Sequence, residues 1–419
     1  MRLEAGEKSS FGGAGGRRFR MEQMKSSTGE ERKPQMNKRV RVALAELIAL
    51  AGAAAVLAIY MASITDSSAA ESDFISYWAA GHLLVHGQNP YDFQAVHALE
   101  IAAGRNPGEP VLMMRNPPVA FFMALPFAWM GPKAGVIVWM FFLLGVLGLA
   151  SRLIWQINGR PDTLLNFFGF GFAPALACLM AGQCGILLLL GIALFLFLYR
   201  ERPFLAGVAL LLCALKPHFF APFGIALLIW CVTTKKGYRI LAGLSAALIA
   251  SCVLAYALDP RAWGQYSEMM RTGGALNEVV PRLSAELRLV IDPRAVWIQF
   301  VPEAVACIWT VWYFWTQRQS WDWMDHGLVL LLVGAMCTPY GFVYDEAMLL
   351  PAIMAGAYRC MESRRPLWPL AVLAVAELLE LGMGATILSR YYLWTTPAWL
   401  CWYLYAAGKF PRQAAAATR

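Results

Sequence analysis

The sequence has few charged residues for its length. Only 15% of its 419 residues are Asp, Glu, Lys or Arg, whereas 59% are hydrophobic and the mean hydropathy is +0.51. This composition excludes an ordinary soluble globular protein. Repeated apolar runs long enough to cross a bilayer instead predict a polytopic membrane protein.

The nine cysteines show no metal-binding or disulfide pattern. All of them lie in or beside apolar segments, and they form no CxxC pair and no Cys/His cluster. The sequence therefore supports neither a zinc site nor a disulfide framework, and we expect the cysteines to be packing residues. His86, His97 and Asp92 could suggest another metal site, but their spacing matches no established ligand set. No metal and no other cofactor is expected.

A repeat of fixed period, which would favour an inverted-repeat transporter, is also missing. Residues 1–40 are polar, Gly/Ser-rich and basic, and this predicts a disordered cytoplasmic tail. No short hydrophobic core followed by a small-residue cleavage site is present there. We therefore expect the first apolar run to remain as a membrane anchor.

The distribution of basic residues predicts the side on which each loop lies. The formal net charge is +8, and basic connectors accumulate on the cytoplasmic side of membrane proteins. A first span from about Val42 to Ile64 follows the basic "NKRVR", so the polar loop 65–116 is predicted to lie outside. A second stretch, 259–296, holds five Arg against five acidic residues and also suits the outer side.

Parity then limits the number of spans. Between Arg115 outside and Arg200 inside the chain must cross an odd number of times, yet it has four apolar runs, at 117–131, 134–156, 164–181 and 184–199. The proline-broken "NPPVAFFMALPFAWMGP" is the best candidate for a re-entrant or interfacial piece. The later runs alternate, which gives about twelve spans. The predicted fold is an all-α helical bundle over 41–408, with cytoplasmic tails at 1–40 and 409–419.

Four polar groupings converge on the outer face in this topology. They are "SDFISYW…GQNPYD", "MAGQCG" around Gln183, "LKPHFF" around Lys216 and "CTPYGFVYDEA" around Asp345. If 72–86 is helical, Asp73 and Tyr77 share one face, with Trp78 and His82 on the neighbouring face. A carboxylate beside aromatic rings at the membrane edge is costly unless something pairs or uses it. The alternative makes Asp73 a helix cap and the rings part of an interfacial belt.

These motifs resemble glycosyltransferase family 87. The resemblance rests on an acidic residue before "FxxYW" and "GxNPYD", then "NPP", "GQ", "LKP" and "TPY…YD", and it runs from about residue 40 to 360. Members of this family are polyprenol-phosphate-mannose dependent mannosyltransferases with the membrane-embedded GT-C fold. The resemblance implies a lipid-phosphate sugar donor, an acceptor hydroxyl arriving from the outer side, inversion at the anomeric centre, and Asp73 as the general base. Many relatives carry Trp or His near the later acid, where this chain has "TPYGFVYDEAMLL".

A cation has to meet the charge of the leaving phosphate. We favour Lys216 for this contact, with His218 and Arg115 as helpers. Lys216 could instead snorkel to the headgroups, and Arg115 could bind a lipid headgroup. His218 could be a satisfied interfacial imidazole.

The sugar or the acceptor is expected to meet further polar side chains. Asp345 could contact sugar hydroxyls or cap the following helix. Gln183 could bond either sugar or backbone, whereas Asp92 and Tyr91 are expected to stabilise the "NPYD" turn. The predicted sugar and acceptor contacts are Tyr77, Trp78, His82, Gln183, Tyr344 and Asp345.

The leading hypothesis is therefore a hexosyltransferase, with mannose as the expected sugar, in the bacterial inner membrane. Its partners would be a polyprenyl-phosphate sugar, a glycolipid or glycan acceptor and membrane lipid, with no nucleic acid. A transporter or flippase without transferase activity is the alternative, and the mid-span Glu377 and Glu380 are the residues that favour it. A non-catalytic assembly protein, in which Asp73 would be free to become Asn, is a third possibility.

Overall fold

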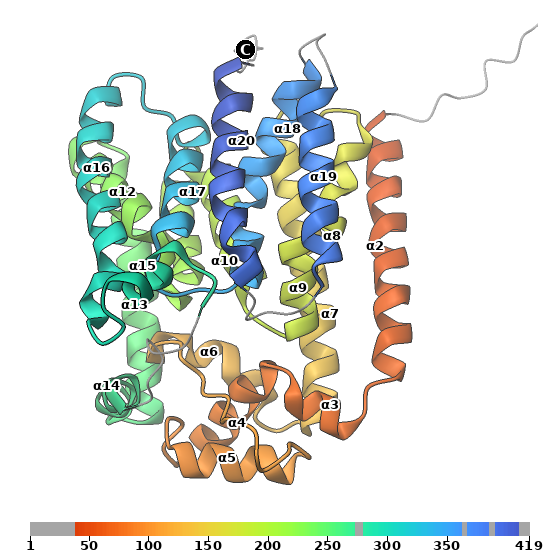
Figure 1. The fold of residues 1–419 in the computed structure, drawn as a ribbon, viewed down its shortest axis with the longest axis vertical. Coiled ribbons are helices and arrows are strands. Elements are labelled where there is room, and N and C mark those ends of the chain that lie inside the picture. Colours follow the sequence, from red (N-terminus) through yellow and green to blue (C-terminus); the bar gives the residue numbers. More distant parts are fainter. Residues whose placement is uncertain (1–37, 273–279, 363–366, 385–389, 410–419) are drawn as a thin grey trace, which may run out of the picture. The chain divides into compact units, whose positions relative to one another are not determined.

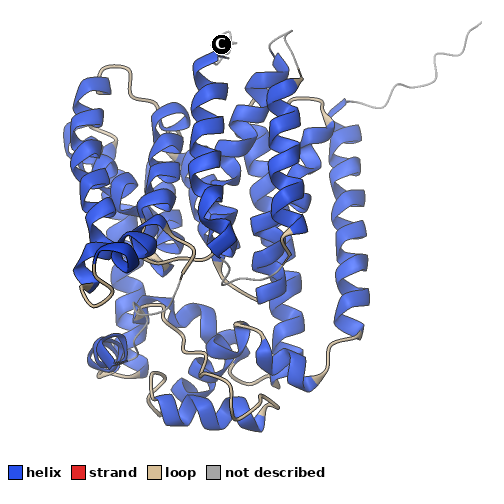
Figure 2. Cartoon of the chain, in the orientation of Figure 1, coloured by secondary structure: helices blue, strands red, loops and turns tan. Residues whose placement is uncertain are grey.

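The computed structural model describes residues 38–272, 280–362, 367–384 and 390–409. All regular structure within these ranges is helical (Figure 2), which confirms the predicted all-α class. The predicted tails, 1–40 and 409–419, lie almost wholly outside the described residues.

The chain divides into two compact units, Met1–Ala45 and Glu46–Arg419. Of the first unit, only the start of α2 (Lys38–Ala62) is described. The second unit contains the rest of α2 and every later helix, and it holds all four polar groupings.

The first polar loop folds into short helices that lie at one end of the bundle, opposite the end of α20 (Thr395–Lys409) and close to α14 (Ala262–Thr272) (Figure 1). Proline, glycine and asparagine in the connecting segments keep these helices short. The loop contains α3 (Asp66–Glu71), α4 (Phe74–Val85) and α5 (Phe93–Ala102). The apolar run that follows it contains the 3-10 turn η1 (Pro118–Ala120), α6 (Phe121–Ala124) and the 3-10 turn η2 (Leu125–Phe127).

The bundle itself is built from longer apolar helices and several 3-10 segments, with one π-helical segment, η8. Its first half comprises α7 (Pro132–Ile157), η3 (Leu164–Phe167), α8 (Phe168–Gly171), α9 (Ala173–Ala181), α10 (Gly185–Leu198), α11 (Pro203–Ala209), η4 (Leu210–Leu215), η5 (Pro217–Phe220), α12 (Ala221–Thr233) and α13 (Gly237–Leu258). Its second half comprises α14 (Ala262–Thr272), α15 (Leu283–Ile291), η7 (Val296–Phe300), α16 (Val301–Gln317), η8 (Trp323–Gly327), α17 (Leu328–Cys337), η9 (Val343–Leu349), α18 (Leu350–Glu362), α19 (Trp368–Gly382), η10 (Arg390–Trp394) and α20 (Thr395–Lys409).

Within the part of the chain that the structure describes, four helical stretches are long and apolar enough to cross a membrane, which supports a polytopic membrane protein. They are Leu44–Ala62, Pro132–Ile157, Leu164–Ala181 and Gly237–Leu258. The α-helices at other predicted spans, such as α10, α12 and α16, are each shorter than the roughly 20 residues that a lone helix needs. The count of about twelve spans therefore stays a prediction.

The proline-broken run 117–131 does not form one helix. It folds as the short pieces η1, α6 and η2, in which most side chains are buried. Helix α4 lies directly against it, because Gly81 has no side chain and a Cβ there would meet the Ala124 carbonyl oxygen at 2.5 Å. Irregular backbone of this kind is tolerated at membrane depth when protein covers it.

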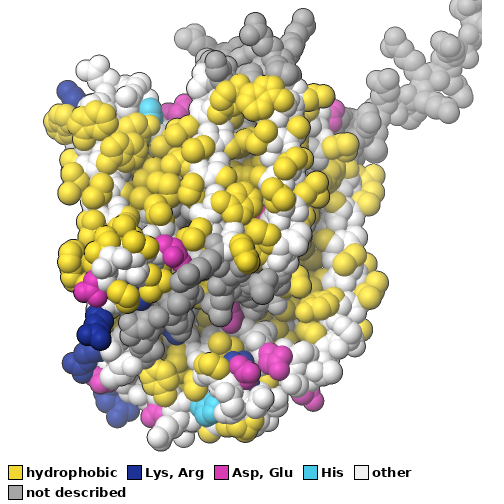
Figure 3. All heavy atoms as spheres, viewed as in Figure 1, with side chains coloured by type: hydrophobic (Ala, Val, Ile, Leu, Met, Phe, Trp, Pro, Cys, Tyr) yellow, Lys and Arg dark blue, Asp and Glu magenta, His cyan; other side chains and the backbone are white. Residues whose placement is uncertain are grey.

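The surface shown in Figure 3 separates apolar from charged regions. Hydrophobic side chains cover α16, α19 and α20, whereas Lys and Arg gather near α14. On α16 the side chains of Ile308, Trp312 and Trp315 are all exposed. An exposed apolar belt of this kind is the surface expected of a chain embedded in lipid.

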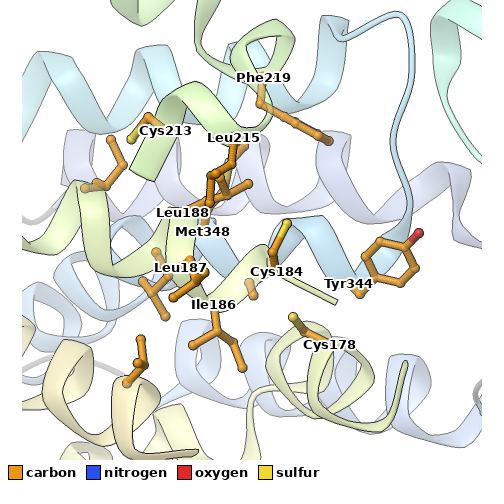
Figure 4. Close-up of a cluster of buried hydrophobic side chains, with 14 of the residues drawn as sticks. Cys178, Cys184, Ile186, Leu187, Leu188, Cys213, Leu215, Phe219, Tyr344 and Met348 are labelled. Atoms are coloured by element: carbon orange, nitrogen blue, oxygen red, sulfur yellow. The ribbon is translucent and has the colours of Figure 1, made fainter. Parts of the chain in front are cut away.

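Helix α10 forms the centre of the bundle and sets the position of the residues before it. It is apolar on all sides and almost wholly buried, with Ile186, Leu187 and Leu188 in the cluster of Figure 4. At its first residue, Gly185, a Cβ would lie 2.5 Å from the Tyr344 carbonyl oxygen. The start of α10 therefore packs directly against the backbone of η9.

Candidate active site

Asp73 stands at the start of α4, but its side chain does not cap that helix. The residue occupies the N-cap position without a side-chain capping bond. Its backbone N–H donates to the Ala181 carbonyl at 2.9 Å, and its Oδ2 accepts from Gln183 Nε2 at 2.8 Å. The capping alternative therefore does not describe this carboxylate, which is partly buried and engaged by a distant segment.

The turn between α9 and α10 presents Gln183 to Asp73. Gly182 adopts φ +72°, a left-handed conformation that glycine takes at little cost, and it ends α9. Trp139 Nε1 donates to the Gly182 carbonyl at 2.8 Å and fixes the turn from α7. The Gln183 Oε1 then accepts from Tyr77 Oη at 2.8 Å, on the face of α4 that also carries Asp73.

Lys216 lies between η4 and η5 and points inward. Its Nζ donates to Asp345 Oδ1 at 2.6 Å and to Gln183 Oε1 at 3.4 Å, and it lies 5.1 Å from the centre of the Tyr344 ring. Only 14% of the Lys216 side chain is exposed, so the ammonium does not snorkel to the headgroups in this structure.

Asp345 is fully buried on η9 and uses its two oxygens differently. Oδ1 pairs with Lys216, whereas Oδ2 accepts the backbone N–H of Phe342 at 3.1 Å. The predicted capping role of Asp345 is therefore present, and the ion pair with Lys216 is an additional contact that the sequence did not indicate. One continuous hydrogen-bonded network, Asp73–Gln183–Lys216–Asp345, joins residues from all four polar groupings.

Arg115 and His218 gather around a residue near this network, Tyr340. Arg115 donates to the Tyr340 hydroxyl, and the His218 ring lies 6.3 Å from the Tyr340 ring. His218 Nε2 is buried and has no hydrogen-bond partner among the described residues. Both side chains therefore contact Tyr340, which belongs to the segment that leads to Asp345.

Trp78 and His82 face the proline-broken run 117–131 and not the Asp73 network. Trp78 Nε1 donates to the Met130 carbonyl at 2.8 Å, the two rings stack at 5.5 Å, and His82 Nδ1 lies 3.3 Å from the Ala128 carbonyl oxygen. Trp78 also lines a cavity of about 340 Å³ together with Asp66 and Lys133. The structure does not join these two side chains to the Asp73 network.

The surroundings of Asp73 make it more basic than a free carboxylate. Burial raises the pKa of Asp73 above its ordinary value of 3.8, and this effect outweighs the hydrogen bond from Gln183 and the positive charge of Lys216, which both lower it. A carboxylate with a raised pKa accepts a proton more readily, which suits a general base.

Sequence reasoning missed several residues that hold the site together. Asn116, the first letter of "NPP", donates through Nδ2 to the Leu215 carbonyl at 2.9 Å, next to Lys216. Its own carbonyl accepts from the Tyr91 hydroxyl at 3.0 Å, and this bond ties the "NPYD" turn to the bundle. The "NPP" motif includes Asn116, but the motif does not indicate that Asn116 bonds to Leu215 and Tyr91.

Other predicted residues have structural partners. Asp92 caps α5 through bonds to the N–H groups of Gln94 and Ala95. Glu377 and Glu380 of α19 are both buried, and Glu377 Oε2 accepts the Ala173 N–H at 2.9 Å. The described residues contain no group of three or more His, Cys, Asp or Glu side chains that could hold a metal ion.

Comparison with known proteins agrees with the motifs. A family model described as glycosyltransferase family 87 matches residues 115–339, more than half of the chain, and confirms the resemblance. This range contains Arg115, Gln183 and Lys216, whereas Asp73 and Asp345 lie outside it and are joined to it by hydrogen bonds. No curated protein and no solved structure matches the chain. An all-helical membrane protein with this match belongs to glycosyltransferase family 87.

Proposed function

We propose that this glycosyltransferase transfers a hexose, mannose, from a polyprenyl-phosphate donor to an acceptor hydroxyl on the outer face of the bacterial inner membrane. The observation that carries the proposal is the network Asp73–Gln183–Lys216–Asp345, which couples a basic carboxylate to a cation within one set of hydrogen bonds. Both groups are needed when an alcohol displaces a phosphate.

Asp73 is the general base of the proposed reaction. The acceptor O–H gives its proton to the Asp73 carboxylate while the acceptor oxygen forms a bond to the anomeric carbon. The bond from that carbon to the donor phosphate oxygen breaks, and its electron pair leaves with the phosphate. A single displacement of this kind inverts the anomeric centre. Asp73 Oδ1 has no hydrogen-bond partner in the described part of the chain, so it is the oxygen that takes the proton.

Lys216 stabilises the departing phosphate. Its ammonium has three donors, of which two point at Asp345 and Gln183, and the third serves the phosphate. Arg115 and His218 both lie next to Tyr340. In the proposal Arg115 adds positive charge near the phosphate, and His218 adds a further hydrogen-bond donor. A phosphate already carries stable negative charge, so the proposal requires no metal ion.

The remaining contacts orient the sugar and the acceptor. Tyr77, Gln183 and Tyr344 present polar groups next to Asp73 and Lys216. Trp78 and His82 lie on the adjacent face of α4, so any role they have concerns a more distant part of the acceptor.

Transfer from defined donors tests the proposal. Purified protein in lipid nanodiscs would receive labelled mannose either as polyprenyl-phosphate mannose or as a nucleotide-diphosphate mannose, with a membrane glycolipid extract as acceptor. We expect transfer from the lipid-linked donor alone, and a product with the opposite anomeric configuration. Transfer from the sugar nucleotide, or retention of configuration, would contradict the proposal.

Gln183→Leu is expected to move the acid limb of the pH–rate profile to higher pH. The Gln183 hydrogen bond lowers the pKa of Asp73, so its loss raises that pKa further above 3.8. Asp73 then becomes protonated, and inactive as a base, at a higher pH than in the wild type. The measurement is kcat/KM between about pH 4 and pH 8. Gln88→Leu, at an exposed position in the same loop, should leave the limb in place. An unshifted limb in Gln183→Leu would remove this role of the amide.

A further inference from the structure

The segment between α17 and η9 is held by three buried side chains, two from the predicted second outer loop (259–296) and one from η7. This segment, 338–342, leads directly to Tyr344 and Asp345. The donors are Arg282, Ser284 and Gln299, and each is at most 1% exposed. Their bonds run from Ser284 Oγ to the Thr338 carbonyl, from Gln299 Nε2 to the Pro339 carbonyl at 2.6 Å, from Arg282 Nε to the Gly341 carbonyl at 3.1 Å and from the Arg282 guanidinium to the Phe342 carbonyl.

Arg282 is the centre of this contact. Besides the two carbonyls, its guanidinium donates to Glu346 Oε1 at 2.8 Å, and that oxygen also accepts from Thr395 Oγ1 at 2.8 Å. The planar fork of an arginine can reach two carbonyls and a carboxylate at once, whereas a lysine offers one point charge. Arg282 therefore joins the second outer loop, η9 and the start of α20.

Phe342 connects Arg282 to Asp345, which in turn binds Lys216, the proposed phosphate-binding cation. Arg282 holds the Phe342 carbonyl, and Asp345 Oδ2 holds the Phe342 N–H at 3.1 Å. Asp345 Oδ1 holds Lys216 at 2.6 Å. A displacement of Phe342 would therefore move Asp345, and with it the Lys216 ammonium.

A second contact links Arg282 to the segment after Lys216. The guanidinium lies 5.9 Å from the centre of the Phe219 ring, three residues beyond Lys216. A Cβ at Gly341 would lie 2.4 Å from Phe219 Cζ and 3.2 Å from Arg282 Nε. Gly341, Phe219 and Arg282 are therefore packed with no room for an added methyl group at Gly341. Because close-packed groups move together, a shift of the loop that carries Arg282 would also shift Gly341 and Phe219.

We propose that Arg282 is a positioning residue for donor binding. It fixes the 338–342 segment so that Asp345 holds the Lys216 ammonium where the donor phosphate arrives. The inference rests on the proposed function, because it assigns Lys216 to that phosphate. Through Arg282 the second outer loop controls the affinity for the lipid-linked donor without touching the substrate.

Arg282→Lys tests this role because it keeps a positive charge for Glu346 and loses the fork that spans two carbonyls. We expect the KM for polyprenyl-phosphate mannose to rise about 10-fold, as for a misplaced binding group, with the KM for acceptor changed by less than about twofold. The melting temperature in detergent should fall little. Arg359→Lys is the matched control: Arg359 is 7% exposed and pairs with Asp325, away from the network. Neither KM should change in that variant.

A second variant covers the case in which Arg282→Lys does not fold. Arg282→Met combined with Glu346→Gln removes both buried charges together, so no lone charge is left inside. It should show the same selective rise in donor KM. Equal changes in donor KM, acceptor KM and kcat that follow the fraction of folded protein would overturn the positioning role, as would wild-type kinetics. A wild type that transfers nothing from the lipid-linked donor would instead contradict the proposed function itself.

Discussion

Asp73→Asn is expected to lower kcat by about 10² to 10⁴-fold, the usual contribution of a general base. The amide cannot take the acceptor proton, yet its oxygen can still accept the 2.8 Å hydrogen bond from Gln183. Folding and the KM for the donor should therefore stay close to those of the wild type. The measurement is steady-state transfer of labelled mannose from polyprenyl-phosphate mannose, at matched amounts of folded protein.

Asp92→Asn provides the control within the same polar loop. The Asp92 side chain caps α5, and asparagine is an equally good N-cap residue. This variant should keep full activity. A loss of activity in Asp92→Asn would show that the loop is sensitive to any loss of negative charge. Equal activity of Asp73→Asn and the wild type would remove the proposed base. A non-catalytic assembly protein would likewise show no difference between Asp73→Asn and the wild type, because its role does not depend on the charge of Asp73.

The helical architecture was accessible from the sequence because apolar runs and their polar connectors are local features. The predicted run 134–156 corresponds to α7, and 239–258 corresponds to α13. The number of crossings was less accessible, because it depends on length and on shelter by neighbours. Helix α10 is short for a lone span, yet it is almost entirely enclosed by protein.

The candidate residues Asp73, Lys216 and Asp345 could be picked out from the sequence, because a charged group beside apolar segments stands out. The structure places them together: Gln183 joins Asp73 to Lys216, and Lys216 bonds directly to Asp345. The ion pair between Asp345 and Lys216 was not accessible, because the sequence suggested only a helix cap or a sugar contact for this carboxylate. A carboxylate has two oxygens, and only the fold shows that each has its own partner.

Arg282 illustrates what the sequence could not show. It is one of five arginines in a loop with five acidic residues, so its charge gave no signal. Its partner Glu346 directly follows Asp345, yet the two carboxylates pair with different cations from different segments. Pairings of this kind depend on contacts between residues far apart in the chain, and no local pattern encodes them.

Lys216→Met should lower kcat/KM for the lipid-linked donor by about 10² to 10³-fold, as expected when a single group that stabilises developing negative charge is removed. The methionine fills a similar volume but presents no donor to the phosphate. The same change removes a positive charge that lowers the pKa of Asp73, so the acid limb of the pH–rate profile should also move to higher pH. The measurement is kcat/KM for polyprenyl-phosphate mannose as a function of pH.

A lone buried carboxylate is the main confounding effect in this variant. Without Lys216, Asp345 would remain fully buried and lose its counter-charge, a defect that typically costs 3–5 kcal/mol, so about that much stability is at risk. Lys216→Met combined with Asp345→Asn removes both charges and should recover the melting temperature without recovering transfer. Lys216→Arg keeps the charge and should retain more donor use than either methionine variant. If the neutral pair instead restored activity, the ammonium would serve only to neutralise Asp345, and the phosphate would have to be met by Arg115 or another cation.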